Sequence, residues 1–130
     1  MNIINNIRIH IPFYINKRYN IPSNGDFLHF CIIFKRKGKK ITPIYTGYNC
    51  NRIHAEINAI NKIKDEKNVI IFVFRITKTG KLTSSKPCSN CTKKIYENNI
   101  KNIYYSENDQ NIYMANINNL LKNPHVRTSK

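Results

Sequence analysis

Residues 69–106 read VIIFVFRITKTGKLTSSKPCSNCTKKIYENNIKNIYYS, and their pattern of strand, helix and strand is the main evidence for an α/β fold. The first part of this stretch, residues 69–76, is almost entirely apolar and rich in β-branched side chains, as expected of a central strand buried on both faces. Residues 77–86 are polar and predict a loop. Residues 88–98 then predict a helix, and residues 101–106 predict a second strand.

The chain before this stretch adds a hairpin and two helices. Apolar and aromatic residues at 27–34 and 41–48 flank a basic turn, and this pattern predicts two paired strands. Isoleucines at helical spacing predict an amphipathic helix over residues 54–64. Isoleucines within residues 1–20 also follow helical spacing, although Pro12 and clustered asparagines weaken that pattern.

The C-terminal part adds a strand over residues 111–116 and a short helix near Leu121. Only residues 107–110 connect the last two strands. A parallel crossover needs about a dozen residues or more, so these strands should be antiparallel. The whole pattern predicts an α/β fold, a three-layer α-β-α sandwich with about five strands. We expect a single domain over 1–130, with an N-terminal helix or extension (1–26), a core (27–116) and a C-terminal helix or tail (117–130).

Length and composition fit one compact unit inside a cell. The chain has 130 residues, of which 41% are hydrophobic, enough to fill one core. No apolar run approaches the roughly 18 residues that a membrane helix needs. The isoleucine-rich N-terminus is interrupted by polar residues and lacks the cleavage site of a signal peptide. We therefore expect an intracellular, cytoplasmic protein with no membrane partner.

The net charge of +15 has two interpretations. Excess lysine and arginine attract phosphate, which favours a nucleic-acid partner. The chain is equally rich in isoleucine, asparagine and tyrosine, however, and AT-rich codons encode all of these residues together with lysine. Genome composition alone could supply much of the charge, so the charge does not decide the substrate.

Four cysteines divide into a pair and two single residues. Cys88 and Cys91 form a Cys-x-x-Cys pair after a proline, and in an intracellular protein this favours metal binding over a disulfide. Cys31 lies in an apolar run and is expected to pack as a small buried hydrophobe. Cys50 is ambiguous, because it lies only four residues before His54.

The residues that carry chemistry lie at the starts of two predicted helices. Cys88 and Cys91 share one helix face, so both sulfurs can reach one ion. His54, from the other helix start, would complete three protein ligands, which leave zinc an open position for catalysis. Zinc lowers the pKa of a bound water towards about 7, and Glu56, two residues after His54, is placed to transfer a proton.

These positions form the pattern His-x-Glu followed by Pro-Cys-x-x-Cys, which resembles the signature of the cytidine/deoxycytidylate deaminase superfamily. The segments HAEINAI (54–60) and SKPCSNCTKKIYENNIKNIYYS (85–106) are similar to the deoxycytidylate-deaminase form of these helices and the following strand. Gly47-Tyr48-Asn49 is similar to the Gly-x-Asn that precedes the metal helix. The resemblance, over about 27–116, implies one zinc ion per chain and, in many small members, a homo-oligomer. The roles it implies are His54, Cys88 and Cys91 for zinc, Glu56 for proton transfer, Asn49 for the sugar, and the backbone around Ala55 and Ser85 to Pro87 for the base.

The predicted terminal hairpin and the motif segments quoted above resemble different branches of the superfamily. Antiparallel final strands resemble the free-nucleoside cytidine deaminases, the blasticidin deaminases and several bacterial toxin deaminases. The deoxycytidylate, tRNA-adenosine and APOBEC-type enzymes insert a helix and have parallel final strands. The hairpin decides the expected architecture, and neither feature decides the substrate.

Several residues keep a second interpretation. A non-catalytic zinc module would need a fourth ligand, with Cys50, His29 or His10 as candidates. Asn49 could simply form a turn. Arg52 and Lys86 could contact a phosphate or be ordinary solvated charges. The tyrosines at 104, 105 and 113 could stack on bases or pack in the core.

Three functional classes follow. The leading hypothesis is hydrolytic deamination of a small cytosine-containing nucleoside or nucleotide of the cytidine, deoxycytidine or deoxycytidylate class. The second is a cytosine or adenine deaminase of DNA or RNA that uses the basic surface. The third is a zinc-binding module without catalytic activity.

Overall fold

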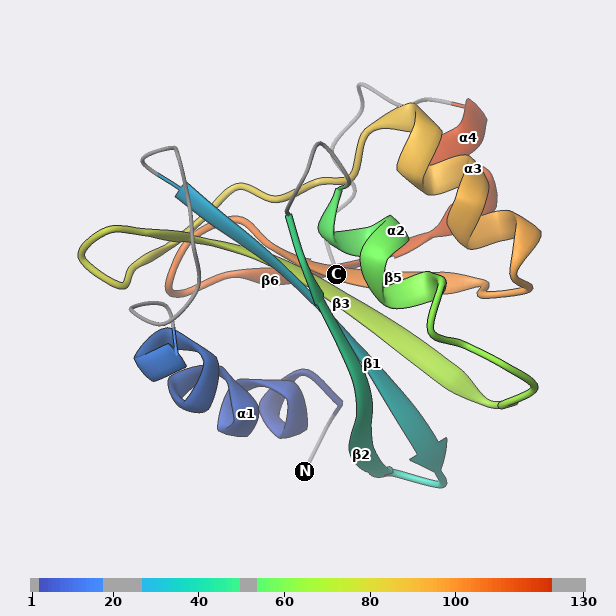
Figure 1. Cartoon of the computed structure of the whole chain (residues 1–130), viewed down its shortest axis with the longest axis horizontal. Coiled ribbons are helices and arrows are strands. Elements are labelled where there is room, and N and C mark those ends of the chain that lie inside the picture. Colours follow the sequence, from blue (N-terminus) through green and yellow to red (C-terminus); the bar gives the residue numbers. More distant parts are fainter. Residues whose placement is uncertain (1–2, 18–26, 50–53, 123–130) are drawn as a thin grey trace.

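The computed structural model describes residues 3–17, 27–49 and 54–122, which form ten helices and strands (Figure 1). In chain order these elements are α1 (Ile3–Lys17), β1 (Phe27–Lys37), β2 (Lys40–Tyr48), α2 (Ala55–Ile60), β3 (Val69–Thr77), β4 (Leu82–Thr83), α3 (Ser89–Glu97), β5 (Asn102–Ser106), β6 (Ile112–Asn116) and α4 (Ile117–Lys122). None of the helices in these segments is long and apolar enough to cross a membrane.

One mixed sheet forms the centre of the fold, with strand order β2-β1-β3-β5-β6. β1 pairs antiparallel with both β2 and β3, and β3 pairs parallel with β5. β5 and β6 pair antiparallel from Asn102 opposite Asn116 to Ser106 opposite Ile112. Both predicted hairpins are therefore confirmed, including the terminal one that the short connection requires.

The sheet has a sixth strand that the sequence analysis placed in a loop. β4 pairs antiparallel with β3, with Leu82 opposite Ile76 and Thr83 opposite Arg75. Leu82 is buried in the core, and its backbone N–H donates to the Asp109 side chain at 2.7 Å. The prediction of a polar loop over 77–86 was wrong at these two residues, because one buried leucine among polar neighbours is too short a signal for a strand.

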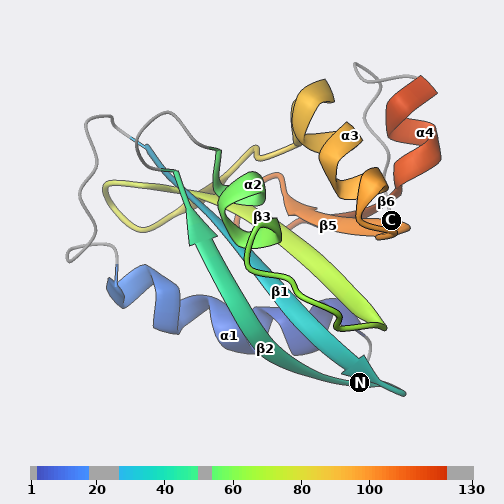
Figure 2. The ribbon, with the colours of Figure 1, turned by 45° about the vertical axis from the view of Figure 1, so that its right-hand side comes forward.

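Helices cover both faces of the sheet, which confirms the three-layer sandwich (Figures 1 and 2). Alternate side chains of β1 point to opposite faces. Phe30, Ile32 and Phe34 pack in the cluster that includes α1. Cys31 and Ile33 pack in the cluster that includes α2 and α4. Since both faces are buried, the central strands are apolar at successive positions rather than at alternate ones.

Helix α1 forms despite Pro12. Ile7, Ile11 and Tyr14 are buried along one stripe at helical spacing, whereas Pro12 is exposed. The Arg8 guanidinium also donates hydrogen bonds to the carbonyl groups of Asp109 and Gln110, at 2.8 and 2.6 Å. Burial of the stripe and these links to the β5–β6 connection stabilise a helix that local propensity leaves weak.

Helix α2 is shorter than predicted. It ends at Ile60, although isoleucine spacing suggested a helix over 54–64. The backbone N–H groups of Lys62 and Ile63 donate to carbonyls three residues earlier, so the helix tightens and ends. Glu66 then accepts hydrogen bonds from the Tyr45 hydroxyl and the Lys64 backbone, which holds the connection to β3 against β2.

Gly47 lets α2 lie directly against β2. A Cβ atom at this position would lie 2.5 Å from the Ala55 carbonyl oxygen and 2.9 Å from the Ala59 Cβ atom. Both neighbours belong to α2 and are fully buried, so they have little room to move. Any larger side chain at 47 would push away the helix that begins next to His54.

We expect Gly47→Ala to lower the free energy of unfolding by about 1–3 kcal/mol, because the added methyl overpacks this contact. Thermal or denaturant unfolding measures the effect. Thr42→Ala, an exposed position of the same strand, should change stability by no more than about 0.5 kcal/mol and serves as the control. Equal stability of Gly47→Ala and the native protein would contradict this close packing.

Candidate metal and catalytic centre

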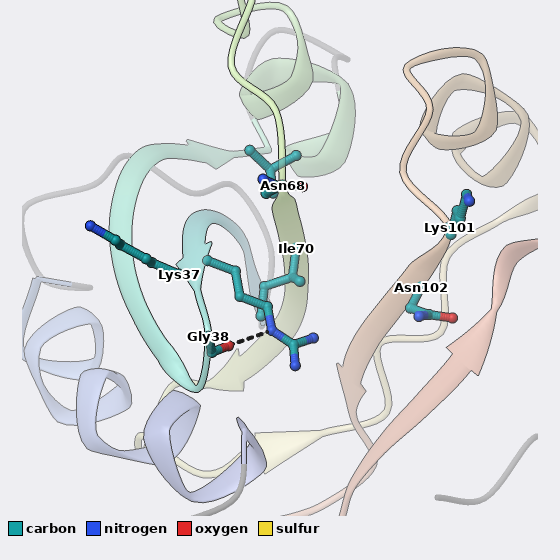
Figure 3. Close-up of a pocket in the computed structure, with 8 residues that line it drawn as sticks. Lys37, Gly38, Asn68, Ile70, Lys101 and Asn102 are labelled. Atoms are coloured by element: carbon teal, nitrogen blue, oxygen red, sulfur yellow. Dashed lines mark hydrogen bonds between the residues drawn. The ribbon is translucent and has the colours of Figure 1, made fainter.

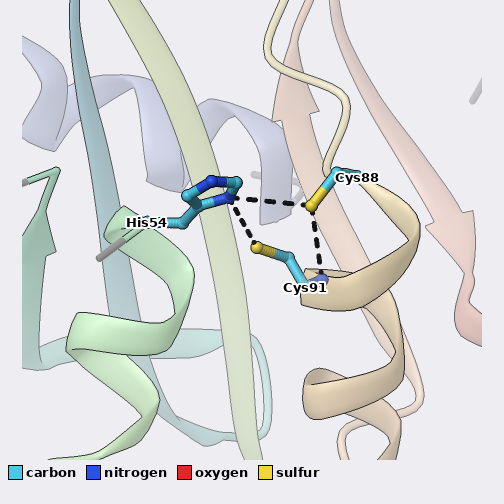
Figure 4. Close-up of side chains that lie close together, drawn as sticks. All are labelled: His54, Cys88 and Cys91. Carbon is cyan, nitrogen blue, oxygen red and sulfur yellow. Dashed lines mark hydrogen bonds between the residues drawn. The ribbon is translucent and has the colours of Figure 1, made fainter. Parts of the chain in front are cut away.

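Two helix starts bring one imidazole and two thiols together (Figure 4). His54 precedes α2 and Cys88 precedes α3, and both have extended backbone with φ near −70° (−67° and −70°). Cys91 lies in the first turn of α3. The Nδ1 atom of His54 lies 3.1 Å from the Cys91 sulfur and 3.6 Å from the Cys88 sulfur.

Hydrogen bonds from Cys91 and Thr92, in the first turn of α3, hold Cys88 in place. The Cys91 N–H donates to the Cys88 sulfur at 3.4 Å. The Thr92 N–H and hydroxyl both donate to the Cys88 carbonyl at 2.9 Å. These bonds fix the position of the Cys88 sulfur relative to Cys91, so both sulfurs face the same point in front of the helix.

The donor set fits zinc. All three ligand atoms lie within 4.8 Å of one another. Tetrahedral zinc, with bonds of about 2.3 Å to sulfur and about 2.0 Å to nitrogen, places ligand atoms roughly 3.5–3.8 Å apart. The separations from the His54 nitrogen are close to this range, so small adjustments would complete the site. Among the described residues, these three are the ones grouped in this way.

Glu56 is buried beside the ligands. Its side chain is 4% exposed. Burial raises the pKa of the carboxyl group, while its hydrogen bonds to its own backbone and the Cys91 side chain, and the charge of His54, act in the opposite direction. A buried carboxyl group in contact with a metal-binding thiol is typical of a group that exchanges protons during a reaction.

The electrostatic environment of Cys91 favours a bound cation at this position. Burial raises the pKa of its thiol well above the ordinary value, and the Glu56 carboxylate and the Cys88 sulfur raise it further. Negative charge on both Cys91 and Glu56 is therefore costly without a compensating positive charge. A divalent metal would supply that charge.

A comparison with protein families agrees with this geometry. The model of the family described as "Cytidine and deoxycytidylate deaminase zinc-binding region" matches residues 18–107, well over half of the chain. The chain belongs to this family. It is therefore a zinc-dependent deaminase, and His54, Cys88 and Cys91 are arranged so that they could hold the zinc ion. Comparisons with curated proteins and with solved structures give no match.

The loop before α3 positions the Pro-Cys-x-x-Cys segment of the deaminase through a buried pair of serines. The Ser85 hydroxyl lies 2.8 Å from the Val73 carbonyl and 2.9 Å from the Ser106 hydroxyl. It also accepts a hydrogen bond from the Ser106 backbone N–H at 2.9 Å. Pro87 is buried next to Cys88. These bonds fix the loop to β3 and β5 and thereby set where α3 begins.

Asn49 extends the β1–β2 ladder past the end of β2. Its side-chain oxygen accepts a hydrogen bond from the His29 backbone N–H at 2.9 Å, and its own N–H donates to the His29 carbonyl at 3.3 Å. The amide orientation is thus fixed, with its NH₂ group as the remaining donor. Ala55, in the first turn of α2, is fully buried.

The sheet beneath the helices carries a cation that the sequence analysis did not consider. Arg75 lies opposite His29 in the β1–β3 register, and both side chains are half-buried. Burial, together with the smaller effects of the charges of Arg75 and His54, lowers the pKa of His29 to about 4. The sequence did contain a signal for this cation, namely a single arginine within the apolar strand 69–77. His29 was considered only as a fourth zinc ligand, and it is not in the ligand group of the described residues.

The titration of His29 predicts loss of stability in acid. Its folded-state pKa of about 4 lies below the ordinary 6.5, so protonation favours the unfolded chain. The stabilising contribution is present above pH 6.5 and is lost as the pH falls towards 4. Replacing His29 with asparagine should flatten the stability curve in this interval, as measured by urea unfolding at several pH values. A variant curve parallel to the native one would contradict this assignment.

The structure also bears on the remaining residues for which the sequence left two interpretations. Cys31 is fully buried and free, as predicted. His10 lies in α1 and packs on Phe34 of β1. This is the face of the sheet opposite to the one that α2 and α3 cover, so His10 is not the fourth ligand. Cys50 and Arg52 lie outside the described residues. Lys86 is half-buried.

The tyrosines of β5 and β6 pack rather than present a stacking surface. Tyr105 is fully buried and meets Tyr113 edge to face at 5.9 Å. Tyr104 is 9% exposed and belongs to the core on the α1 side. The packing interpretation is therefore confirmed for these residues, and Tyr113 is partly buried against the same core as Tyr105.

Proposed function

We propose that this deaminase converts a small cytosine-containing nucleoside or nucleotide to the uracil form, with Glu56 as the proton-transfer group. The observation that carries the proposal is the buried Glu56 carboxyl beside His54, Cys88 and Cys91. Zinc held by these three residues would supply a water of lowered pKa, about 7 in known sites.

The chain's own contribution is the movement of protons. Glu56 takes a proton from the attacking water and delivers it to ring nitrogen N3 as oxygen adds to C4. It then carries the second proton of that oxygen to the amino group, which leaves as ammonia while the C4 carbonyl forms. Burial suits this role, because a raised pKa brings the carboxyl group closer to the operating pH.

Three residues are proposed to contact the substrate. The fixed amide of Asn49 leaves its NH₂ group as a donor, which suits a sugar hydroxyl. Ala55 and Pro87 follow the family pattern, in which the backbone beside each ligand contacts the base. Both residues are buried next to the zinc ligands.

The aromatic residues of β5 favour a small substrate over a polynucleotide. The β5–β6 hairpin does not discriminate between substrates, because antiparallel final strands occur in the free-nucleoside branch, the blasticidin deaminases and several bacterial toxin deaminases that the chain resembles. The buried positions of Tyr104 and Tyr105 remove two of the aromatic residues that a polynucleotide deaminase could use for stacking.

A substrate panel tests the proposal. Zinc-loaded protein is incubated with cytidine, deoxycytidine, their monophosphates, and single- and double-stranded DNA and RNA, and uracil and ammonia are measured. We expect product from at least one free nucleoside or monophosphate. Product only from polynucleotides would replace the small-substrate proposal with the polynucleotide one. No product, together with a fourth protein ligand on zinc, would instead establish a non-catalytic zinc module.

A further inference from the structure

A basic groove lies at one end of the sheet, away from the zinc site at the other end (Figure 3). It has a volume of about 570 Å³ and is formed where β1 ends and where β3 and β5 begin. The zinc ligands instead follow the ends of β2 and β4. The nine residues of β3 that separate the two ends span roughly 30 Å. Its lining residues are Arg36, Lys37, Gly38, Asn68, Val69, Ile70, Lys101 and Asn102.

The charge of the groove is entirely positive. Its lining includes Arg36, Lys37 and Lys101, and no lining residue is acidic. Figure 3 shows Asn68 and Ile70 between the hairpin that carries Lys37 and the strand start that carries Lys101. All three cations are exposed. Their charges therefore act on solvent and on any anion that enters.

The backbone fixes the shape of this end of the sheet. The Arg36 N–H donates to the Asn68 carbonyl at 2.8 Å, which links the β1–β2 hairpin to the start of β3. The Arg36 Nε atom donates to the Gly38 carbonyl at 2.8 Å, and the rest of its guanidinium carries further donors. Gly38 has φ +63°, which suits the tight turn.

Positive charge continues beyond the groove along the hairpin. Residues 35–40 read KRKGKK, and every residue of this segment is exposed. An extended row of cations matches a repeating anion better than a single small one. The lining offers amide groups from Asn68 and Asn102 but no aromatic ring, so it suits backbone contact rather than base stacking.

We propose that this groove and the adjoining hairpin bind the phosphodiester backbone of a nucleic acid. The interaction is electrostatic and independent of base sequence, because phosphates carry no sequence information. It gives part of the +15 net charge a defined location. The proposal concerns a surface distinct from the zinc site, and it does not rest on the proposed substrate.

Fluorescence anisotropy with labelled 20-nucleotide DNA and RNA strands and a DNA duplex tests the proposal over a series of salt concentrations. The test variant Lys37→Gln/Lys101→Gln removes two cations of the groove and keeps their aliphatic stems. The control variant Lys81→Gln/Lys93→Gln removes two exposed lysines elsewhere, at the same cost in net charge. Melting temperature and zinc content should be unchanged in both variants.

Two lost phosphate contacts should reduce the magnitude of the log K against log salt slope by about 1.4 for single strands. Affinity should fall about tenfold or more near 0.1 M salt, and the control should stay within about twofold of the native protein. Equal losses in both variants would overturn the proposal in favour of general charge attraction, and absence of binding by the native protein would overturn it outright. Deamination of free nucleosides is a separate measurement, so either proposal can fail alone.

Discussion

Glu56→Gln should reduce the turnover of a cytosine substrate by about 10²–10⁴-fold, the usual contribution of general acid–base catalysis. The substitution keeps the size of the side chain but removes its ability to accept and return a proton. Zinc content should stay near one ion per chain, because Glu56 is not among the three grouped ligand atoms. Steady-state kinetics on the best substrate of the panel, with zinc measured by elemental analysis, provides both values.

Stability separates a catalytic role for Glu56 from a structural one. Burial raises the pKa of this carboxyl group in the folded state, so its ionised form costs stability as the pH rises through that pKa. A neutral glutamine should therefore not lower the melting temperature at pH 7. Glu97→Gln, at an exposed carboxylate of α3, is the matched control and should keep full activity. Comparable rates for Glu56→Gln and the control would rule out the proposed role.

Cys91→Ser should remove zinc from the protein and abolish activity. The Cys91 sulfur lies 3.1 Å from the His54 nitrogen and is fully buried, so the two remaining donors would form an incomplete site. Zinc content should fall below roughly a tenth of an ion per chain, and the melting temperature should fall with it, because metal binding contributes folding free energy. Elemental analysis and thermal unfolding measure the two effects.

Two other cysteine variants sharpen this result. Cys31→Ala changes a buried cysteine on the same side of the sheet that is not in the ligand group, and it should keep its zinc. Cys50→Ser tests the fourth-ligand alternative directly, and we expect full zinc content and activity. Zinc retained in Cys91→Ser, or lost in Cys50→Ser, would require a different ligand set.

The sequence predicted the grouping of Cys88 with Cys91 and every strand except β4, because these signals are local. Successive apolar residues at 69–76 indicate burial on both faces, and the short connection at 107–110 permits only a hairpin. Cys88 and Cys91 are three residues apart at a helix start, which places both sulfurs on one face whatever the rest of the chain does.

Other features depend on contacts between distant segments, which periodicity does not encode. Isoleucine spacing suggested a longer α2, but Glu66 and Tyr45 hold the chain in another direction after Ile60. β4 exists because β3 offers a partner to Leu82. Arg75 acts on His29 only because β1 and β3 pair in one register.

Local sequence patterns are enough to predict the family, the order of the main elements and the residue types grouped at the candidate zinc site. Tertiary packing sets how His54 meets Cys88 and Cys91 at the starts of α2 and α3, how deeply Glu56 is buried, and where the basic groove lies. Helix starts and ligand spacing are set by neighbouring residues. The burial and pKa of Glu56 are set by how α2 and α3 pack on each other and on the sheet, and the groove is set by how β1, β3 and β5 meet at their ends.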